Sequence, residues 1–161
     1  MEIWDIYDSE RRPTGRTHVR GVPVPDGDYH LVIRAWVMRN DGKILLSKRH
    51  PDKPYGNYWE CTGGAVAAGE DTLTGAIREV REEVGLTVDR EHAVLLQTGR
   101  GKECFFDIYL FRQDIQEEVV YQPEEVIDAK WVNRSEYEEM EKNGLIIPGM
   151  TPLYEYIDFF K

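Results

Sequence analysis

Short runs of apolar residues, separated by turn-forming residues, predict a series of β-strands along this chain. Residues 30–38 (HLVIRAWVM) are expected to form a buried strand, and the Asn-Asp-Gly sequence at 40–42 is typical of a hairpin turn. Residues 43–48 (KILLSK) should return as the partner strand. Closely spaced prolines and glycines predict loops at 11–28 and 50–58. Further strands are expected at 2–7, 59–61, 93–98, 103–112 and 129–132.

Residues 72–84 show the period of a helix. At about 100° per residue, five apolar side chains fall within one arc of roughly 100° and should pack on the sheet: Leu73, Ala76, Ile77, Val80 and Val84. Asp71 or Thr72 can cap the first turn, and Gly85 is a natural stop. The sequence therefore predicts a helix with clear ends and one buried face.

Two more helices are expected near the C-terminus. One covers residues 135–142 and is capped by Ser135, and the other covers residues 151–161. Strands and helices are mixed and the strands include hairpins, which indicates an α+β or mixed α/β fold. We expect one domain over all 161 residues, with the strand and loop at 1–28 as a short extension.

Composition and charge narrow the range of functions. With 41% hydrophobic residues the chain has enough apolar surface for one globular core. Its net charge of −10 argues against a nucleic-acid polymer as partner, but a small anionic substrate can bind through a divalent cation. No apolar run reaches the roughly 18–20 residues that span a bilayer, so no membrane partner is expected. The N-terminus lacks signal-peptide features, and Cys61 and Cys104 are expected to be reduced, which favours a cytoplasmic location.

Three glutamates lie on the arc of the 72–84 helix beside its apolar stripe. Glu79, Glu82 and Glu83 share a face because residues three and four apart are neighbours on a helix. Carboxylates this close repel each other, and a bound Mg²⁺, which prefers oxygen ligands, reverses the sign of that interaction. An E-x-x-E-E triplet alone is more often a solvated face, neutralised here by Arg78 and Arg81. Only the residues around the triplet can distinguish a metal site from a solvated face.

That surrounding sequence resembles a known family motif. Residues 64–86 read GAVAAGEDTLTGAIREVREEVGL, similar to the Nudix box of glycine, five residues, glutamate, seven residues and R-E-U-x-E-E-x-G-U, with U apolar. A chance match at one start has a probability on the order of 10⁻⁸, which favours the metal site. Residues 4–7 and 15–18 are also similar to a Nudix branch related to isopentenyl-diphosphate isomerase. The specified places of the box are filled by Gly64, Glu70, Arg78, Glu79, Val80, Glu82, Glu83, Gly85 and Leu86.

The resemblance implies a Nudix-type αβα sandwich with a mixed sheet. It implies hydrolysis of a phosphoanhydride bond in a nucleoside diphosphate or triphosphate, or in a nucleoside diphosphate linked to another group. It also implies a Mg²⁺ or Mn²⁺ cofactor held by Glu79, Glu82, Glu83 and the Gly63 carbonyl. Such an ion withdraws charge from phosphorus and lowers the pKa of a bound water, which then attacks.

Several residues are candidates for the remaining roles. The proton acceptor varies within the family, and Glu82, Glu124 and Glu125 are the candidates here. Lys48 or Arg49, at a strand end near the box, could hold a phosphate, although exposed basic pairs are often plain surface. A homodimer is expected only by analogy with similar folds. Four aromatic residues could stack on a base, although such residues more often belong to the core: Tyr55, Tyr58, Trp59 and Phe106.

Two alternative functions stay open at this point. An isomerase of an isoprenoid diphosphate would use His18 and His30 as metal ligands, and Cys61 or Cys104 as an acid. Against it, the chain has no segment like the Asn-Cys-Cys-Ser-His segment of that enzyme, and its Nudix box is complete. The second alternative is a non-catalytic module that senses a nucleotide, and such modules commonly lose box glutamates. The hydrolase is therefore favoured over both.

Overall fold

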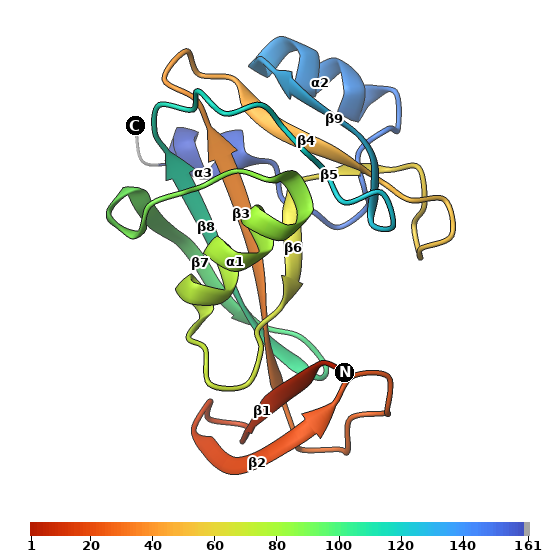
Figure 1. Cartoon of the computed structure of the whole chain (residues 1–161), viewed down its shortest axis with the longest axis vertical. Helices are drawn as coiled ribbons and strands as arrows, with labels where there is room; N and C mark the ends of the chain where they lie inside the picture. The colour runs from red at the N-terminus through yellow and green to blue at the C-terminus, as the bar shows by residue number, and fades with distance from the viewer. Residues whose placement is uncertain (160–161) are drawn as a thin grey trace.

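The computed structural model describes residues 1–159 of the chain, and Figure 1 shows its arrangement. The helices are α1 (Thr72–Val84), α2 (Arg134–Lys142) and α3 (Leu153–Phe159), with a 3₁₀ turn at Arg90–His92. The strands are β1 (Ile3–Tyr7), β2 (Pro13–Val19), β3 (His30–Met38), β4 (Ile44–Arg49), β5 (Trp59–Glu60), β6 (Thr62–Ala65), β7 (Ala93–Arg100), β8 (Cys104–Arg112) and β9 (Val126–Val132). Among the described residues, none of the helices is long and apolar enough to cross a membrane.

A mixed seven-stranded sheet forms the centre of the molecule. Its main path runs β5-β4-β3-β8-β7, with β6 added to β3 and β9 added to β4. The β3 and β8 strands are parallel along their whole length, and the other pairs are antiparallel. The β3–β4 hairpin pairs only where Met38 faces Ile44, because β6 takes the place beside the first half of β3. The sheet therefore divides at this point.

Alternation along β3 separates two apolar cores, one on each face of the sheet. Ile33 and Val37 pack with the apolar residues of α1, whereas Trp36 and Met38 pack on the other face with residues of α2 and α3. Figure 1 shows α1 in front of β3 and β8, and α3 behind them. The predicted αβα sandwich with a mixed sheet is confirmed.

The N-terminal segment differs from the expectation. The region 11–28 was expected to be loop, yet β2 lies within it and pairs with β1 as a separate two-stranded sheet. The β2 side chains are mostly exposed, so the strand is held by backbone pairing rather than by an apolar pattern of its own. A turn containing Arg11, with φ of 61°, joins the two strands.

One ion pair fastens this hairpin to the central sheet. Asp107 on β8 accepts hydrogen bonds from both Arg11 terminal nitrogens, at 2.9 and 2.7 Å. The same carboxylate also accepts from the Thr72 and Thr98 hydroxyls, at 2.6 Å each. Burial alone acts to raise the pKa of Asp107, but these hydrogen bonds outweigh it and lower the pKa. The hairpin is thus docked through a buried, fully hydrogen-bonded carboxylate.

The C-terminal helices begin slightly away from their predicted starts. The α2 helix is capped by Asn133 rather than Ser135, because Asn133 and Glu136 form a reciprocal capping box that fixes the first turn one residue earlier. The α3 helix starts at Leu153 rather than at residue 151. The predicted continuation of that helix through residues 160 and 161 lies outside the described residues.

Candidate active site

The α1 helix is a rigid platform for the box glutamates. Its predicted bounds are confirmed: Asp71 caps it by accepting from the Thr74 backbone N–H at 2.7 Å, and Gly85 ends it in the left-handed conformation with φ of 73°. Ala76, Val80 and Val84 on its apolar face are fully buried against β3 and β8. This burial fixes the rotation of the helix and therefore the direction of its acidic side chains.

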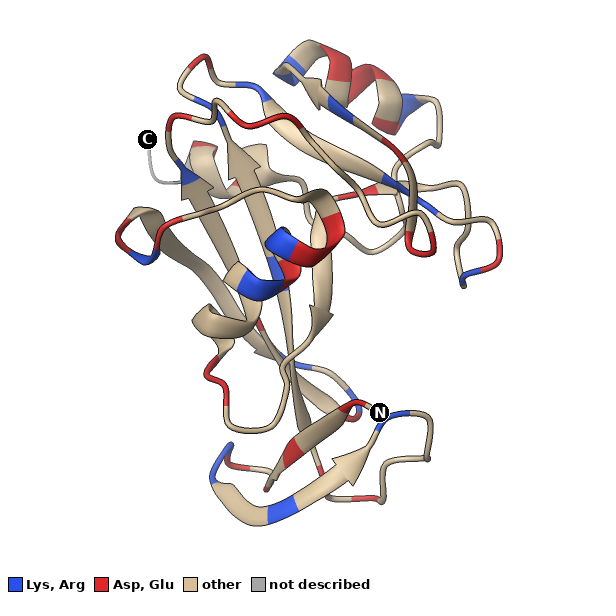
Figure 2. Ribbon diagram, viewed as in Figure 1, with Lys and Arg blue, Asp and Glu red and all other residues tan. Residues whose placement is uncertain are grey.

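Those glutamates line a polar cavity of about 210 Å³ between α1 and β6. Glu79, Glu82 and Glu83 all reach it, together with Gly63 and Gly64. Their exposure is graded, since Glu83 is only 9% exposed while the Glu82 side chain is 53% exposed. Figure 2 shows acidic segments both on α1 and in the loop before β9, which supplies Glu125 to the same cavity.

Glu83 is the most unusual group of the cavity. Its buried carboxylate accepts no hydrogen bond from any residue that the structure describes. Burial raises its pKa well above the ordinary value, and the neighbouring charges of Glu79 and Glu60 raise it further. Burial also raises the pKa of Glu79, although a hydrogen bond from Arg78 opposes this. The charges of Lys53 and Arg49 lower the pKa of Glu83 but do not outweigh these effects. A buried carboxylate that no donor contacts fits a divalent cation, which supplies a positive charge in direct contact.

Arg78 holds the acidic residues in place. Its Nη1 atom donates to Glu79 at 2.9 Å and to Glu82 at 3.1 Å. Its Nε and Nη2 atoms donate to the two carboxylate oxygens of Glu70, at 2.8 and 3.1 Å, and Nη2 also reaches the Ala65 carbonyl. The guanidinium stands between Glu79 and Glu82, so the oxygens of the three box glutamates do not all lie within 4.8 Å of one another. Mg²⁺ keeps several water ligands, so such a spacing is compatible with it.

Gly64 permits the close approach of Glu79 to β6. A Cβ atom at this position would lie 2.4 Å from the Glu79 carboxyl carbon, far inside contact distance. Gly63 faces the opposite side of the strand, where a Cβ would lie 3.9 Å from Cγ of Arg34. The two consecutive glycines therefore serve opposite faces of β6.

The candidates for proton acceptor separate in the structure. Glu82 and Glu125 line the cavity, and Glu125 forms an ion pair with Lys53. Glu124 is exposed and does not line the cavity. The two neighbours lie in a turn in which the Glu125 N–H donates to the Gln122 carbonyl at 3.0 Å. Which of the two side chains faces the cavity depends on this turn, so the sequence alone did not distinguish them.

Neither of the basic residues predicted to hold a phosphate lines this cavity. Arg49 is engaged by Glu60 at 2.7 Å and by the Pro54 carbonyl at 2.8 Å, and the Lys48 ammonium lies 5.9 Å from the Trp59 ring centre. Lys48 and Arg49 are consecutive residues of β4, so their side chains point to opposite faces of the sheet and cannot contact the same phosphate.

The cations that do line the cavity are Lys53, Arg20 and Arg78. Lys53 comes from the proline-rich loop after β4, and Arg20 follows β2 and pairs with Glu2 at 2.6 Å. Sequence reasoning missed Lys53 and Arg20 because both come from segments read as plain loop. The sequence offered one indication for Lys53, namely that it is a basic residue in the loop that precedes the strand leading into the box.

The groups that an isomerase would need are used differently. The Nε2 atom of His18 lies 2.9 Å from the Val22 carbonyl oxygen, and the His30 ring stacks on Trp4 with ring centres 4.0 Å apart. Cys61 and Cys104 are both free thiols, and burial raises the pKa of Cys61 to about 12. Within residues 1–159, the one group of three side chains with metal-ligand spacing is exposed, follows the box by a few residues and does not line the glutamate cavity: Asp89, Glu91 and His92.

Comparison with known proteins gives a consistent picture. The family model described as the NUDIX domain matches residues 28–153. An uncharacterized Nudix hydrolase of Listeria monocytogenes is 35% identical over 151 residues, covering 92% of this chain and 89% of that protein. The crystal structure of DR0079 from Deinococcus radiodurans superposes with a TM-score of 0.71 at 21% identity, over 92% of this chain and 93% of the other. The NUDIX domain of Shewanella oneidensis NrtR, solved with ADP ribose, superposes with a TM-score of 0.58 at 18% identity, over 69% of this chain and 77% of the other.

Proposed function

The chain belongs to the Nudix hydrolases, which act on pyrophosphate bonds, and we propose that its substrate is a nucleotide and its cofactor a divalent metal ion. The proposed reaction is hydrolysis of the phosphoanhydride of a nucleoside diphosphate or triphosphate, or of a nucleoside diphosphate linked to another group. The binding of ADP ribose by the NrtR NUDIX domain supports a nucleotide-like ligand. The net charge of −10 supports a small substrate over a nucleic-acid polymer.

The observation that carries the metal proposal is the buried, donor-less carboxylate of Glu83. Mg²⁺ or Mn²⁺ would be held by Glu79, Glu82, Glu83 and the Gly63 carbonyl. When bound, the ion supplies Lewis acidity toward phosphorus and a water of lowered pKa. Arg78 keeps Glu79 and Glu82 in position, and Gly64 leaves room for Glu79 beside the strand.

The protein residues would handle the proton and the phosphates. Water attacks phosphorus, the bond to the bridging oxygen breaks, and the water proton passes to Glu125 or Glu82 at the cavity wall. Lys53 and Arg20 would contact the negative oxygens of the diphosphate from the side opposite the helix. Both candidate bases are paired with a cation, Glu82 with Arg78 and Glu125 with Lys53, so separate substitution of each glutamate has to identify the base.

The test is turnover of a panel of nucleoside diphosphate compounds with Mg²⁺ in ¹⁸O-labelled water. We expect product that carries ¹⁸O on phosphorus and that vanishes with EDTA and in Glu83→Gln. Glu141→Gln, an equivalent change on the exposed face of α2, should leave the rate unchanged. Label on carbon would refute attack at phosphorus, and nucleotide binding without turnover would instead favour a sensor module.

A further inference from the structure

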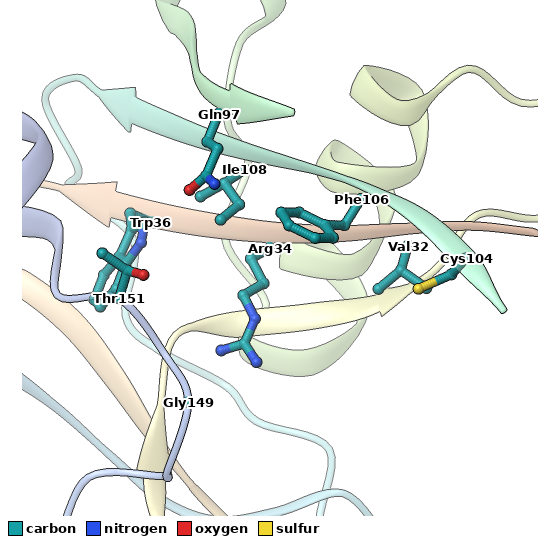
Figure 3. A pocket seen from close by; sticks show the side chains of 9 residues that line it. All are labelled: Val32, Arg34, Trp36, Gln97, Cys104, Phe106, Ile108, Gly149 and Thr151. Atoms are coloured by element: carbon teal, nitrogen blue, oxygen red, sulfur yellow. The ribbon is translucent and has the colours of Figure 1, made fainter. Parts of the chain in front are cut away.

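A second cavity, of about 280 Å³, lies on the opposite face of the sheet from α1. Figure 3 shows side chains of β3, β7 and β8 projecting into it. Its walls are apolar and partly aromatic, formed by Val32, Trp36, Phe106 and Ile108. Pockets for drug-sized ligands span roughly 300–1,000 Å³, so this volume suits a single flat ring system.

Arg34 is the one charged residue among the described residues that line this cavity. It is half-buried, and it forms no hydrogen bond or ion pair with any residue of the described chain. By contrast, the half-buried Arg49 and Arg78 are each held by a carboxylate. A guanidinium removed from water without an acceptor is unfavourable. Arg34 is therefore poised for an acceptor that comes from a ligand.

Gln97, one of the other polar side chains of the cavity, also offers donors. The Gln97 amide oxygen accepts from the Tyr156 hydroxyl at 2.6 Å, which leaves the amide nitrogen as its free end. The guanidinium adds five N–H donors in a planar fork. A ligand that satisfies this cavity thus combines a flat apolar face, for Phe106, with an edge of oxygen or nitrogen acceptors.

The β6 strand connects this cavity with the glutamate cavity. Gly64 faces Glu79 on α1, and Gly63 faces Arg34 on the other side. Among the described strands, β6 pairs only with β3, so its other edge is not covered by a strand. No side chain longer than the methyl group of Ala65 projects from residues 63–65. One ligand can therefore contact both cavities by passing this edge.

Resting on the proposed function, we propose that this second cavity binds the base of the nucleotide and that Arg34 selects a base with a carbonyl oxygen on its edge. Hypoxanthine and guanine present two adjacent acceptors, O6 and N7, to a guanidinium, whereas adenine presents an amino donor beside N7. Arg34 is a specificity residue in this scheme, and Phe106 stacks on the base. An isoprenoid tail would leave Arg34 without an acceptor, which argues against the isomerase alternative.

The test compares ITP with ATP, which differ at purine position 6 by oxygen against an amino group. Titration calorimetry in EDTA measures binding without turnover. We expect ITP to bind roughly 10- to 100-fold more tightly than ATP, the range of one bidentate base contact. Arg34→Met should abolish this preference, mainly by weakening ITP binding. Arg34→Lys, which keeps the charge but loses the fork, should retain only part of it.

A matched control is Arg39→Gln on the segment that follows β3. Arg39 pairs with Asp41 at 2.8 Å and lies over Trp131, away from the cavity, so the ITP/ATP ratio should not change. Equal affinities, binding of neither nucleotide, or an ITP preference that survives Arg34→Met would each overturn the proposal. Metal-dependent hydrolysis of both nucleotides at equal efficiency would do so while leaving the proposed function intact. If the wild type hydrolyses neither nucleotide in the presence of Mg²⁺, that result would contradict the proposed function rather than the role of Arg34.

Discussion

Removing the negative charge of Glu83 should stabilise the metal-free protein while abolishing its activity. Glu83 is 9% exposed, its carboxylate accepts no hydrogen bond from a described residue, and the effects of burial, Glu79 and Glu60 on its pKa outweigh those of Lys53 and Arg49. Its oxygens border the open cavity, so the full penalty of a buried unpaired group does not apply, and the ionised carboxylate costs on the order of 1 kcal/mol. For a domain of this size 1 kcal/mol shifts the melting temperature by about 2–4 °C, so Glu83→Gln should raise it by roughly 2–4 °C.

The pH dependence has a definite sign. The pKa of Glu83 is raised in the folded protein, so the wild type binds this proton more tightly when folded and gains stability as the pH falls. The difference between wild type and Glu83→Gln should therefore be largest at neutral pH and shrink on acidification. Mg²⁺ should reverse the order of stability of the two proteins. A ligand at about 100 times its Kd adds about 2.7 kcal/mol to the free energy of unfolding of the wild type, and it should add less to that of the variant, which lacks the charged ligand.

The assay is differential scanning calorimetry in EDTA and in Mg²⁺, from neutral pH downward. Glu82→Gln is the matched control, because that side chain is 53% exposed and its ion pair with Arg78 contributes little. Its melting temperature in EDTA should stay close to the wild-type value. A Glu83→Gln protein that melts at a lower temperature than the wild type in EDTA at neutral pH would refute the reasoning that the ionised Glu83 carboxylate destabilises the metal-free folded state.

Three more changes test the site and its support. Gly64→Ala would place a Cβ 2.4 Å from the Glu79 carboxyl carbon, which can yield, so kcat should fall by about 100-fold with little change in melting temperature; unchanged steady-state kinetics would contradict this. Glu125→Gln should lower kcat by about 100- to 10,000-fold if it is the base, whereas Glu124→Gln should leave the rate near wild type, and equal effects would remove the distinction. Asp107→Asn should destabilise by about 2–4 kcal/mol in urea unfolding at neutral pH. Because the folded pKa of Asp107 is lowered, that loss should narrow as the pH falls, and a constant difference would argue against the ion pair.

The α1 helix could be predicted to the residue because its determinants are local. The apolar stripe, the Asp71 cap and the Gly85 stop all lie within the helix or one residue from it. The three glutamates lie beside the apolar stripe as predicted, and within this group Glu83 is more buried than Glu82. The helical period of the sequence was therefore sufficient to predict both where α1 lies and that its glutamates share one face.

The parts that could not be predicted depend on distant partners. The β2 strand is held by pairing with β1 and by an ion pair between Arg11 and Asp107, 96 residues apart. Lys53 reaches the cavity because its loop folds back onto Glu125, 72 residues later. No pattern within these segments encodes such contacts, since strand register and loop paths are settled only when the whole sheet forms.

The terminal hairpin extends the glutamate cavity beyond the region that the family model matches. The matched region starts at residue 28, yet Glu2 and Arg20 form part of the wall of the glutamate cavity. Relatives with a different N-terminus would keep the proposed metal-binding helix α1 behind a differently shaped entrance. An appendage of this kind allows substrate choice to diverge among relatives while the hydrolytic core stays untouched.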